Sequence, residues 1–476
     1  MSMLWTGGDI AAQMQARALG ALPAGIGGLS IDTRSLLPGD AFFAIQGEAR
    51  DGHDFVANAF AAGAGLAVVD EAHAEALREC GPLLAVPDVL AGLIALARAS
   101  RRRSMARIVA VTGSVGKTGT KEALKHVLAR QGATHASVAS YNNHWGVPLT
   151  LARMPAETAY GIFEIGMNHS FEILPLTAMV RPHVAVVTTV EPVHLAYFPD
   201  IAAIADAKGE IFSGLMPGGT AIINRDNPHF ARLAAHAAAS PAGRIVTFGA
   251  HEAADIRLVS AGIGPEASDV SVTLFGRPLA YRIGSPGRHT VMNSLAVLGA
   301  VAALGGDAAE AALSLADLSP PEGRGARVRL PLGAGEITLI DESYNANPAS
   351  MRAALAVLAG VPLGSAGRRI AVMGDMLELG PEAARHHSAL ADAVRENGID
   401  LVFACGPEMK HLWDGLPAAG RGAYASASSE LGETLVAALR PGDAVMIKGS
   451  FGSRMGPLVT LLKQRLAGAT AQGAGQ

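Results

Sequence analysis

The sequence predicts an α/β protein of about three domains, built around parallel sheets. The chain has 476 residues, and a domain takes roughly 150 residues. Half of the residues are hydrophobic, only 5% are aromatic and 56 are glycine, which favours layers of small aliphatic side chains over an aromatic-rich β-sandwich. Short β-branched runs alternate with helical patterns along most of the chain, as expected for parallel βαβ units.

Charge and cysteine content narrow the function classes. The formal net charge is −4, and residues 101–103 form the one polybasic block, which we interpret as a solvated helix end. Nucleic acid is therefore not an expected partner. Cys80 and Cys405 have no CxxC or metal-ligand spacing, so we predict no disulfide framework and a reducing, cytoplasmic environment.

The hydropathy pattern predicts no integral membrane segment. The first residues include Asp9 and lack a basic stretch ahead of an apolar core, unlike a signal peptide. Mean hydropathy is +0.28, but the longest stretch without acidic, basic or histidine residues, 290–306, is shorter than the about 20 apolar residues needed to span a bilayer. We expect this stretch to form a buried helix.

Residues 1–86 are predicted to form the first domain. Apolar runs at 41–45 and 66–70 indicate strands, and residues 55–62 between them have a helical pattern. Residues 88–103 follow as an amphipathic connecting helix.

Residues 104–318 are predicted to form a central domain with a parallel sheet. A strand at 108–112 precedes a glycine loop and a helix at 121–130, and residues 255–283 alternate strictly enough to form an antiparallel extension. The further strands are expected at 160–166, 183–190, 220–226 and 244–249.

Residues 319–476 are predicted to form a smaller, Rossmann-like domain. The run Pro320-Pro321-Glu322-Gly323 marks the boundary. Strand-helix alternation then resumes, with strands expected at 336–341, 368–375, 400–406 and 443–449 and helices from Ser350, from Glu382 and over 428–439. His386 and His387 are interpreted as a surface pair, and Met373 and Met376 as packing residues.

The glycine loop has the chemistry of a phosphate-binding loop. Such loops turn backbone N–H groups towards phosphate, and the helix dipole, a lysine and a hydroxyl for Mg²⁺ complete the site. Val111 stands where the longer P-loop form has a glycine, so the match is to the shorter GxxGK[ST] form. The loop residues are Gly113, Ser114, Val115, Gly116, Lys117, Thr118 and Gly119.

A phosphate loop alone leaves kinases, GTPases and ligases open. Glu164 ends an apolar strand, where its carboxylate is placed to bind Mg²⁺. Without further context, a histidine such as His194 is more often structural than catalytic. Lys208 lies in a helical stretch, where a lysine is usually solvated.

Six segments in order carry a family resemblance that covers residues from about 30 to 450. They are TGSVGKTGTKE, SYNNHWGVPLTL, FEIGMNHSFEI, ADAKGEIF, GRHTVMNSLA and IDESYNANPASM. Together they resemble the Mur ligase family. The resemblance implies the three-domain Mur ligase architecture, with a central P-loop ATPase domain and a Rossmann-like C-terminal domain.

The resemblance also implies a reaction and its partners. ATP would phosphorylate the terminal carboxylate of a UDP-MurNAc-tripeptide, and the amine of D-alanyl-D-alanine would attack the acyl phosphate. This is the last cytoplasmic step of peptidoglycan precursor synthesis, which serves cell wall biogenesis, cell shape and cell division. ATP and Mg²⁺ are the implied cofactors, and a monomer is expected.

The resemblance assigns roles to the nucleotide and metal residues. Lys117 and the loop N–H groups would bind the β- and γ-phosphates, with Thr118 and Glu164 on Mg²⁺. Asn143 and His194 would hold the metals and the transferring phosphate.

Four further positions match the family pattern around the nucleotide. Lys208 matches the lysine that is carbamylated in the family, which turns a cation into an anionic metal ligand. Asn293 would contact the adenine and Arg324 the γ-phosphate. Glu342 matches a position that is usually aspartate, so its nucleotide contact comes from a side chain one methylene longer.

Substrate contacts are implied at both ends of the chain. Residues near the incoming dipeptide would be Ser343, Tyr344, Asn345 and Asn347. Lys448-Gly449-Ser450 is a weaker match that also fits a strand-end turn. Candidates for the uridine diphosphate group are Asp32, Thr33, Arg34, Ser35 and Gly47. A simple turn cap by Asp32 and Arg34 is the alternative there.

Three other functions remain as alternatives. The related Mur ligase that adds diaminopimelate or lysine is the first, but its diaminopimelate form carries Asp-Asn-Pro-Arg in the third domain. Here Asp226-Asn227-Pro228 lies in the central domain and is followed by His229. Folylpolyglutamate synthetase lacks the muramyl-nucleotide domain. A P-loop regulatory ATPase is the alternative from another class.

Overall fold

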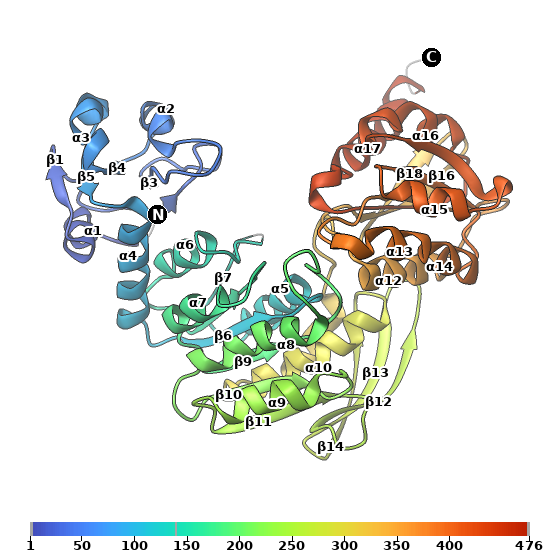
Figure 1. Ribbon diagram of the computed structural model, residues 1–476, viewed down its shortest axis with the longest axis horizontal. Coiled ribbons are helices and arrows are strands. Elements are labelled where there is room, and N and C mark those ends of the chain that lie inside the picture. The colour runs from blue at the N-terminus through green and yellow to red at the C-terminus, as the bar shows by residue number, and fades with distance from the viewer. Residues whose placement is uncertain (1–2, 139, 474–476) are drawn as a thin grey trace.

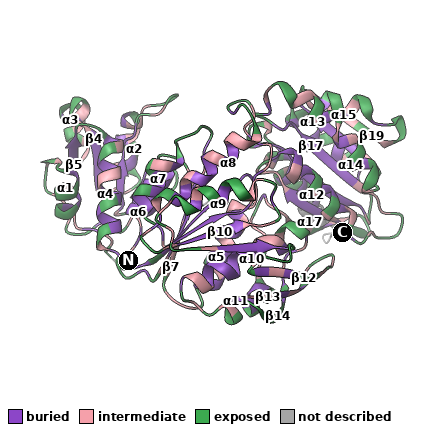
Figure 2. Ribbon diagram, turned by 60° about the horizontal axis from the view of Figure 1, so that its bottom comes forward, coloured by how far each residue is buried: buried purple, intermediate pink, exposed green. Residues whose placement is uncertain are grey.

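The computed structural model describes residues 3–138 and 140–473 and has the predicted three-domain α/β architecture (Figure 1). Its described strands form sheets of five, nine and six strands, one for each domain. The central domain lies between the other two, with the first domain on one side and the C-terminal domain on the other (Figure 1). Buried residues concentrate along the sheets, with exposed residues on the outer helices (Figure 2).

The first sheet has the strand order β1-β5-β4-β3-β2, and only the edge strand β1 runs antiparallel to its neighbour. The helix expected at 55–62 is confirmed as a 3₁₀ turn followed by α2. The elements are α1 (Gly7–Met14), β1 (Arg17–Leu19), β2 (Leu29–Ser30), β3 (Ala41–Phe43), η1 (Gly52–Phe55), α2 (Val56–Ala61), β4 (Leu66–Asp70), α3 (Glu71–Leu77), η2 (Arg78–Cys80) and β5 (Leu83–Val86).

Helix α4 (Val89–Arg103) joins the first domain to the central one, and its end is not solvated as predicted. Arg101 is only 7% exposed. Its Nε donates to the carbonyl of Val180 (2.8 Å) and its Nη2 to that of Arg181 (2.9 Å), which satisfies carbonyls at the end of α7 (Ile173–Val180). Arg103 stacks on the ring of Trp5. The interpretation of the whole triplet as solvated was therefore wrong, because two of its side chains connect packed elements.

Replacing Arg101 by alanine should lower the free energy of unfolding by about 1–3 kcal/mol, because two carbonyls lose their buried donor. The exposed Arg102 is the matched control, and Arg102→Ala should change stability by less than about 0.5 kcal/mol. Urea denaturation followed by circular dichroism measures both. Equal effects of the two substitutions would contradict the capping role.

The central sheet has the order β14-β13-β12-β11-β10-β9-β6-β8-β7. Strands β12 to β14 pair antiparallel, which confirms the extension predicted at 255–283. The strands are β6 (Arg107–Thr112), β7 (Thr134–Ala136), β8 (Tyr160–Glu164), β9 (Val184–Val187), β10 (Thr220–Asn224), β11 (Arg244–Gly249), β12 (Ile256–Ile263), β13 (Ser268–Leu274) and β14 (Arg277–Ile283).

Helices cover both faces of this sheet. One face packs against α5 (Lys117–Leu128), α10 (Arg288–Ala303) and α11 (Ala308–Ser314). The other face shares a continuous core with α4 and the first domain. On that face lie α6 (Gly146–Ala152), α7, α8 (Ile201–Gly209), η3 (Glu210–Gly214) and α9 (Phe230–Ala238). The predicted buried helix at 290–306 is confirmed as α10.

The C-terminal sheet has the order β15-β16-β20-β17-β18-β19, and only β15 is antiparallel. Its strands are β15 (Ala326–Leu332), β16 (Gly335–Glu342), β17 (Arg369–Gly374), β18 (Leu401–Cys405), β19 (Arg421–Ala425) and β20 (Ala444–Lys448). The helices are η4 (Leu315–Asp317), before the domain, then α12 (Pro348–Ala359), η5 (Gly380–Glu382), α13 (Ala383–Ser388), α14 (Leu390–Glu396), α15 (Met409–Gly415), η6 (Ala418–Gly420), η7 (Ser428–Glu430), α16 (Gly432–Ala438), η8 (Phe451–Ser453) and α17 (Gly456–Gly473).

One of the two adjacent histidines of this domain is buried rather than on the surface. His387 has no exposed area, and its Nε2 accepts a hydrogen bond from the backbone of Met376 (3.0 Å). Its Nδ1 lies 2.7 Å from the carbonyl of Ala383. The prediction of a surface pair was wrong, whereas the prediction that Met373 and Met376 are packing residues is confirmed.

None of the helices among the described residues is long and apolar enough to cross a membrane.

Candidate active site

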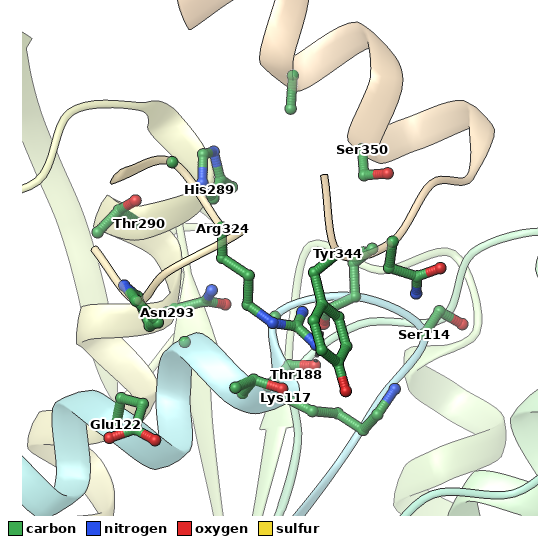
Figure 3. A pocket seen from close by; sticks show the side chains of 18 of the residues that line it. Ser114, Lys117, Glu122, Thr188, His289, Thr290, Asn293, Arg324, Tyr344 and Ser350 are labelled. Carbon is green, nitrogen blue, oxygen red and sulfur yellow. Dashed lines mark hydrogen bonds between the residues drawn. The ribbon is translucent and has the colours of Figure 1, made fainter. Parts of the chain in front are cut away.

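A cavity of about 710 Å³ lies between the central and C-terminal domains. It is lined by the phosphate loop, the loops after β8 and β9, the first turns of α10, the linker around Arg324 and the N-terminal end of α12 (Figure 3). The carboxyl ends of β6, β8 and β9 meet at this edge of the sheet because these strands run parallel. Ligands of open parallel sheets bind at this edge.

The phosphate loop follows β6, as predicted, and turns into α5 at Lys117. Gly116 has φ +87°, and a Cβ there would lie 2.8 Å from the amide of Asn293. No side chain caps the N-terminus of α5 among the described residues. The free N–H groups and the positive end of the helix dipole therefore point at the cavity, which suits a phosphate group.

Lys117 folds back onto this loop. Its Nζ donates to the carbonyl of Gly113 (2.6 Å). Burial lowers the pKa of Lys117, and the charge of Glu164 partly offsets this. An anionic ligand would satisfy the ammonium group better than one carbonyl does.

Three polar side chains converge where the sequence predicts that Mg²⁺ binds. Thr118 Oγ1 donates to Glu164 Oε2 (2.8 Å), and Asn142 Nδ2 donates to Glu164 Oε1 (2.7 Å). Glu164 is only 1% exposed. A carboxylate beside a hydroxyl is the hard oxygen donor set that Mg²⁺ prefers, so these residues fit the ion.

Asn142, not Asn143, contacts this carboxylate. Asn143 Oδ1 accepts from the backbone N–H groups of Trp145 (3.2 Å) and Gly146 (2.9 Å), where α6 begins. The two asparagines are adjacent in the sequence, and the turn into α6 decides which of them faces Glu164.

Asn142→Ala should raise the Mg²⁺ concentration for half-maximal activity by about 10- to 100-fold, because Glu164 loses the donor that orients it. Asn143→Ala should instead lower the melting temperature, because two backbone N–H groups at the start of α6 lose their acceptor. Mg²⁺ titrations and thermal melts of both variants distinguish the two roles. The reverse pattern would return the metal role to Asn143.

Lys208, in the last turn of α8, is not a solvated lysine. It is 2% exposed and has no hydrogen-bond or ion-pair partner among the described residues. Burial, and then the charge of Lys117, lowers its pKa well below the usual value. A lowered pKa increases the fraction of a buried amine that is uncharged and nucleophilic.

His194 connects the central and C-terminal domains. Its Nδ1 lies 2.6 Å from Glu378 Oε2, and the side chain of His194 is 24% exposed. His194 (φ +56°) and Glu378 (φ +64°) both have left-handed backbones. Such conformations cost energy in non-glycine residues and concentrate at functional sites.

Arg324 extends from the domain linker into the cavity (Figure 3). Its guanidinium lies 4.4 Å from the ring centre of Tyr344, and its Nη2 donates to Ser140 Oγ (3.2 Å). Ser140 Oγ is in turn 3.4 Å from Thr118 Oγ1. These contacts hold Arg324 on the phosphate-loop side of the linker.

Glu342 and the segment after it form the opposite wall. Lys448, only 2% exposed, contacts Glu342 Oε2 (3.3 Å) and donates to the carbonyl of Asn345 (2.8 Å). Asn347 caps α12. Tyr344, Asn345 and Asn347 line the cavity, as do Asn293 and Glu342. Ser343 does not, and its hydroxyl donates to Asp341 (2.6 Å).

The candidates for the uridine diphosphate group lie outside this cavity, in the first domain. Arg34 is 87% exposed and pairs with Asp32 (2.6 Å), and this hydrogen bond lowers the pKa of Asp32. Ser35 donates to the carbonyl of Asp32 (3.3 Å). A Cβ on Gly47 would lie 3.1 Å from the ring of Trp145, a central-domain residue.

The comparisons with known proteins cover most of the chain. Family models match at residues 25–101 (Mur ligase family, catalytic domain), 111–301 (Mur ligase middle domain) and 323–451 (Mur ligase, glutamate ligase domain). The chain is 35% identical over 380 residues to the UDP-N-acetylmuramoyl-tripeptide–D-alanyl-D-alanine ligase of Escherichia coli, covering 80% of this chain and 81% of that protein. The chain belongs to the Mur ligase family.

Other Mur ligases extend the match. The Rickettsia prowazekii enzyme of the same name is 31% identical over 431 residues, covering 90% of this chain and 94% of its own. A crystal structure of MurF from Acinetobacter baumannii has TM-score 0.83 and 28% identity and covers 97% of this chain and 99% of its own. MurF ligase from Thermotoga maritima in complex with ADP has the same fold, with TM-score 0.74 and 23% identity over 92% of this chain and 97% of its own.

Several cavity residues of this Mur ligase were not identified from the sequence. They are Asn142, Glu191, His289 and Glu378. The sequence does not distinguish Asn142 from the neighbouring Asn143, which was predicted instead. Glu378 is 184 residues from its partner His194. No local pattern predicts such a pairing. His289 could have been found, because it lies one helical turn before Asn293 on the same face of α10.

Proposed function

We propose that this chain is an ATP-dependent amide ligase that adds D-alanyl-D-alanine to UDP-MurNAc-tripeptide through an acyl phosphate. The observation that carries the proposal is a single cavity lined by the phosphate loop, Glu164, His194 and Arg324. Curated relatives of this name at 31–35% identity over most of the chain support the same substrates.

The binding functions divide among the three domains in this proposal. Residues 1–86 bind the nucleotide end of the muramyl peptide, 104–318 bind ATP, and 319–476 bind the incoming dipeptide at Tyr344, Asn345 and Asn347. The enzyme acts in the cytoplasm, as a monomer. Bringing three substrates together in one water-poor cavity lowers the entropic part of the barrier.

Phosphoryl transfer is proposed to depend on charge placed around the γ-phosphate. The N–H groups of the phosphate loop and Lys117 bind the β- and γ-phosphates, and Arg324 neutralises charge that develops on the transferring group. Thr118, Glu164 and His194 hold Mg²⁺, which supplies further positive charge. Asn293 contacts the adenine, and Glu342 contacts the nucleotide from across the cavity.

Carbamylation of Lys208 completes the proposed site. Its uncharged Nζ attacks carbon dioxide, a C–N bond forms, one proton leaves, and the product is an anionic carbamate. The lowered pKa supports this step because only the free amine reacts. A carbamate oxygen is a suitable ligand for Mg²⁺, whereas an ammonium group is not.

Phosphate release by the purified protein tests the function. Release should require Mg²⁺, ATP, UDP-MurNAc-tripeptide and D-alanyl-D-alanine together. Release no faster than with ATP alone, from folded protein, would overturn the proposal. Release with UDP-MurNAc-dipeptide and diaminopimelate or lysine would establish the alternative Mur ligase activity.

A further inference from the structure

Glu191 follows β9 and lines the cavity beside the phosphate loop. Its backbone is tied to that loop, because its N–H donates to Ser114 Oγ (2.9 Å) and its carbonyl accepts from the same hydroxyl (3.0 Å). The carboxylate has one partner, Thr189 Oγ1, which donates to Oε1 (3.2 Å). The backbone contacts fix the position of the residue without using its charge.

Glu191 differs from the other acidic residues of the cavity. Five glutamates line it among the described residues, and each of the other four has a cationic partner or two hydrogen-bond donors. Their contacts are Glu122 with Lys121, Glu342 with Lys448, Glu378 with His194, and Glu164 with Thr118 and Asn142. Within the described chain, Glu191 has no ion-pair partner, and its Oε2 has no hydrogen bond.

A half-buried carboxylate without an ion-pair partner is stabilised by a positively charged ligand. ATP and the acyl phosphate are anions, whereas the incoming dipeptide has an α-ammonium group. We propose that Glu191 binds this ammonium group and accepts its proton. The inference rests on the proposed ligase function and adds the group that prepares the nucleophile.

Every proton and bond is accounted for when Glu191 deprotonates the dipeptide amine. The ammonium transfers one proton to the carboxylate of Glu191, and the free amine attacks the carbonyl carbon of the acyl phosphate. A C–N bond forms, the C–O bond to phosphate breaks, and the second amine proton leaves with the phosphate. Glu191 then returns its proton to solvent.

The surroundings of Glu191 suit a base. Burial raises its pKa, while the Thr189 hydrogen bond and the charge of His229, from the loop after β10, lower it less. A carboxylate with a raised pKa is closer to the working pH and accepts protons more readily. Three lysine and arginine residues of the described chain share the cavity: Lys117 and Arg324 are placed for phosphate, and Lys448 pairs with Glu342.

Comparing two nucleophiles, hydroxylamine and D-alanyl-D-alanine, distinguishes a base at Glu191 from a purely structural residue. Hydroxylamine is largely uncharged at neutral pH and traps the acyl phosphate as a hydroxamate without needing an ammonium site. Glu191→Gln keeps the acceptor for Thr189, so trapping should stay within about twofold. The kcat/KM for D-alanyl-D-alanine at pH 7 should fall by about 100-fold.

The pH dependence gives a second readout. Without its base, Glu191→Gln must use free dipeptide amine, so its kcat/KM should rise with pH up to about 8, the pKa of an α-amino group. Wild type should level off at lower pH. Glu191→Asp should recover part of the activity and the wild-type pH profile. Glu396 is an exposed glutamate on α14, and Glu396→Gln is the matched control.

The results of these experiments test the role of Glu191 and the ligase function separately. Unchanged kcat/KM for the dipeptide in Glu191→Gln, equal loss of hydroxylamine trapping, or a raised KM for the muramyl peptide alone would overturn the role of Glu191. If both Glu191 variants melt early and lose both reactions, the residue is structural and the inference is wrong. Absence of hydroxamate with wild-type enzyme would overturn the ligase function itself.

Discussion

Arg324→Ala is expected to lower kcat by about 1,000-fold, the lower end of what an arginine at a transferring phosphoryl group contributes. The guanidinium projects into the cavity beside Tyr344 and is anchored to Ser140, which contacts Thr118. This position lets it meet charge that develops on the γ-phosphate. The muramyl peptide should bind almost as well as before, because its nucleotide is proposed to bind to the first domain.

Steady-state kinetics and calorimetric binding of the muramyl peptide test this prediction together. Arg324→Lys should be intermediate, since lysine keeps the charge but not the planar fork of donors. Arg329, exposed on β15 and paired with Glu336, is the matched control, and Arg329→Ala should keep kcat within about twofold. An Arg324→Ala enzyme with normal turnover would remove this residue from the γ-phosphate.

Lys208→Met is expected to lower activity by about 100- to 1,000-fold and to raise thermal stability in carbon dioxide-free buffer. Activity falls because no carbamate can form beside the Mg²⁺ position. Stability rises because methionine fills the space of a buried amine that has no partner among the described residues. A variant with normal turnover would show that the carbamate is not required.

The stability of the unmodified enzyme should depend on pH through the same lysine. Its pKa is lowered in the folded state, so between that value and about 10.4, the ordinary lysine pKa, the unfolded chain binds one more proton. Stability therefore rises with pH over this range. Melts of wild type and Lys208→Met at several pH values should converge as pH rises, and parallel curves would contradict the lowered pKa.

Local pattern predicted most of the fold. The run from Arg107 to Lys117 folds as strand, glycine loop and helix because β-branched residues, positive-φ glycines and a helix start are properties of neighbouring residues. Strands β1, β5, β7, β15 and β19 were not predicted. The run Arg327-Val328-Arg329-Leu330 in β15 does alternate and could have predicted a strand, whereas β19 is short and contains a glycine. Both of these strands are stabilised by pairing with β16 and β18 at the two edges of a sheet.

The sequence by itself determined the family, the order of the elements and the phosphate loop, because each depends on residues close together in the chain. Only the tertiary structure decided that Asn142 contacts Glu164, that His194 meets Glu378, and that Glu191 has no ion pair among the described residues. The burial of Arg101 and Lys208 was decided in the same way. The energies of these side chains depend on charge, solvent and packing supplied by segments distant in sequence, and no local pattern contains that information.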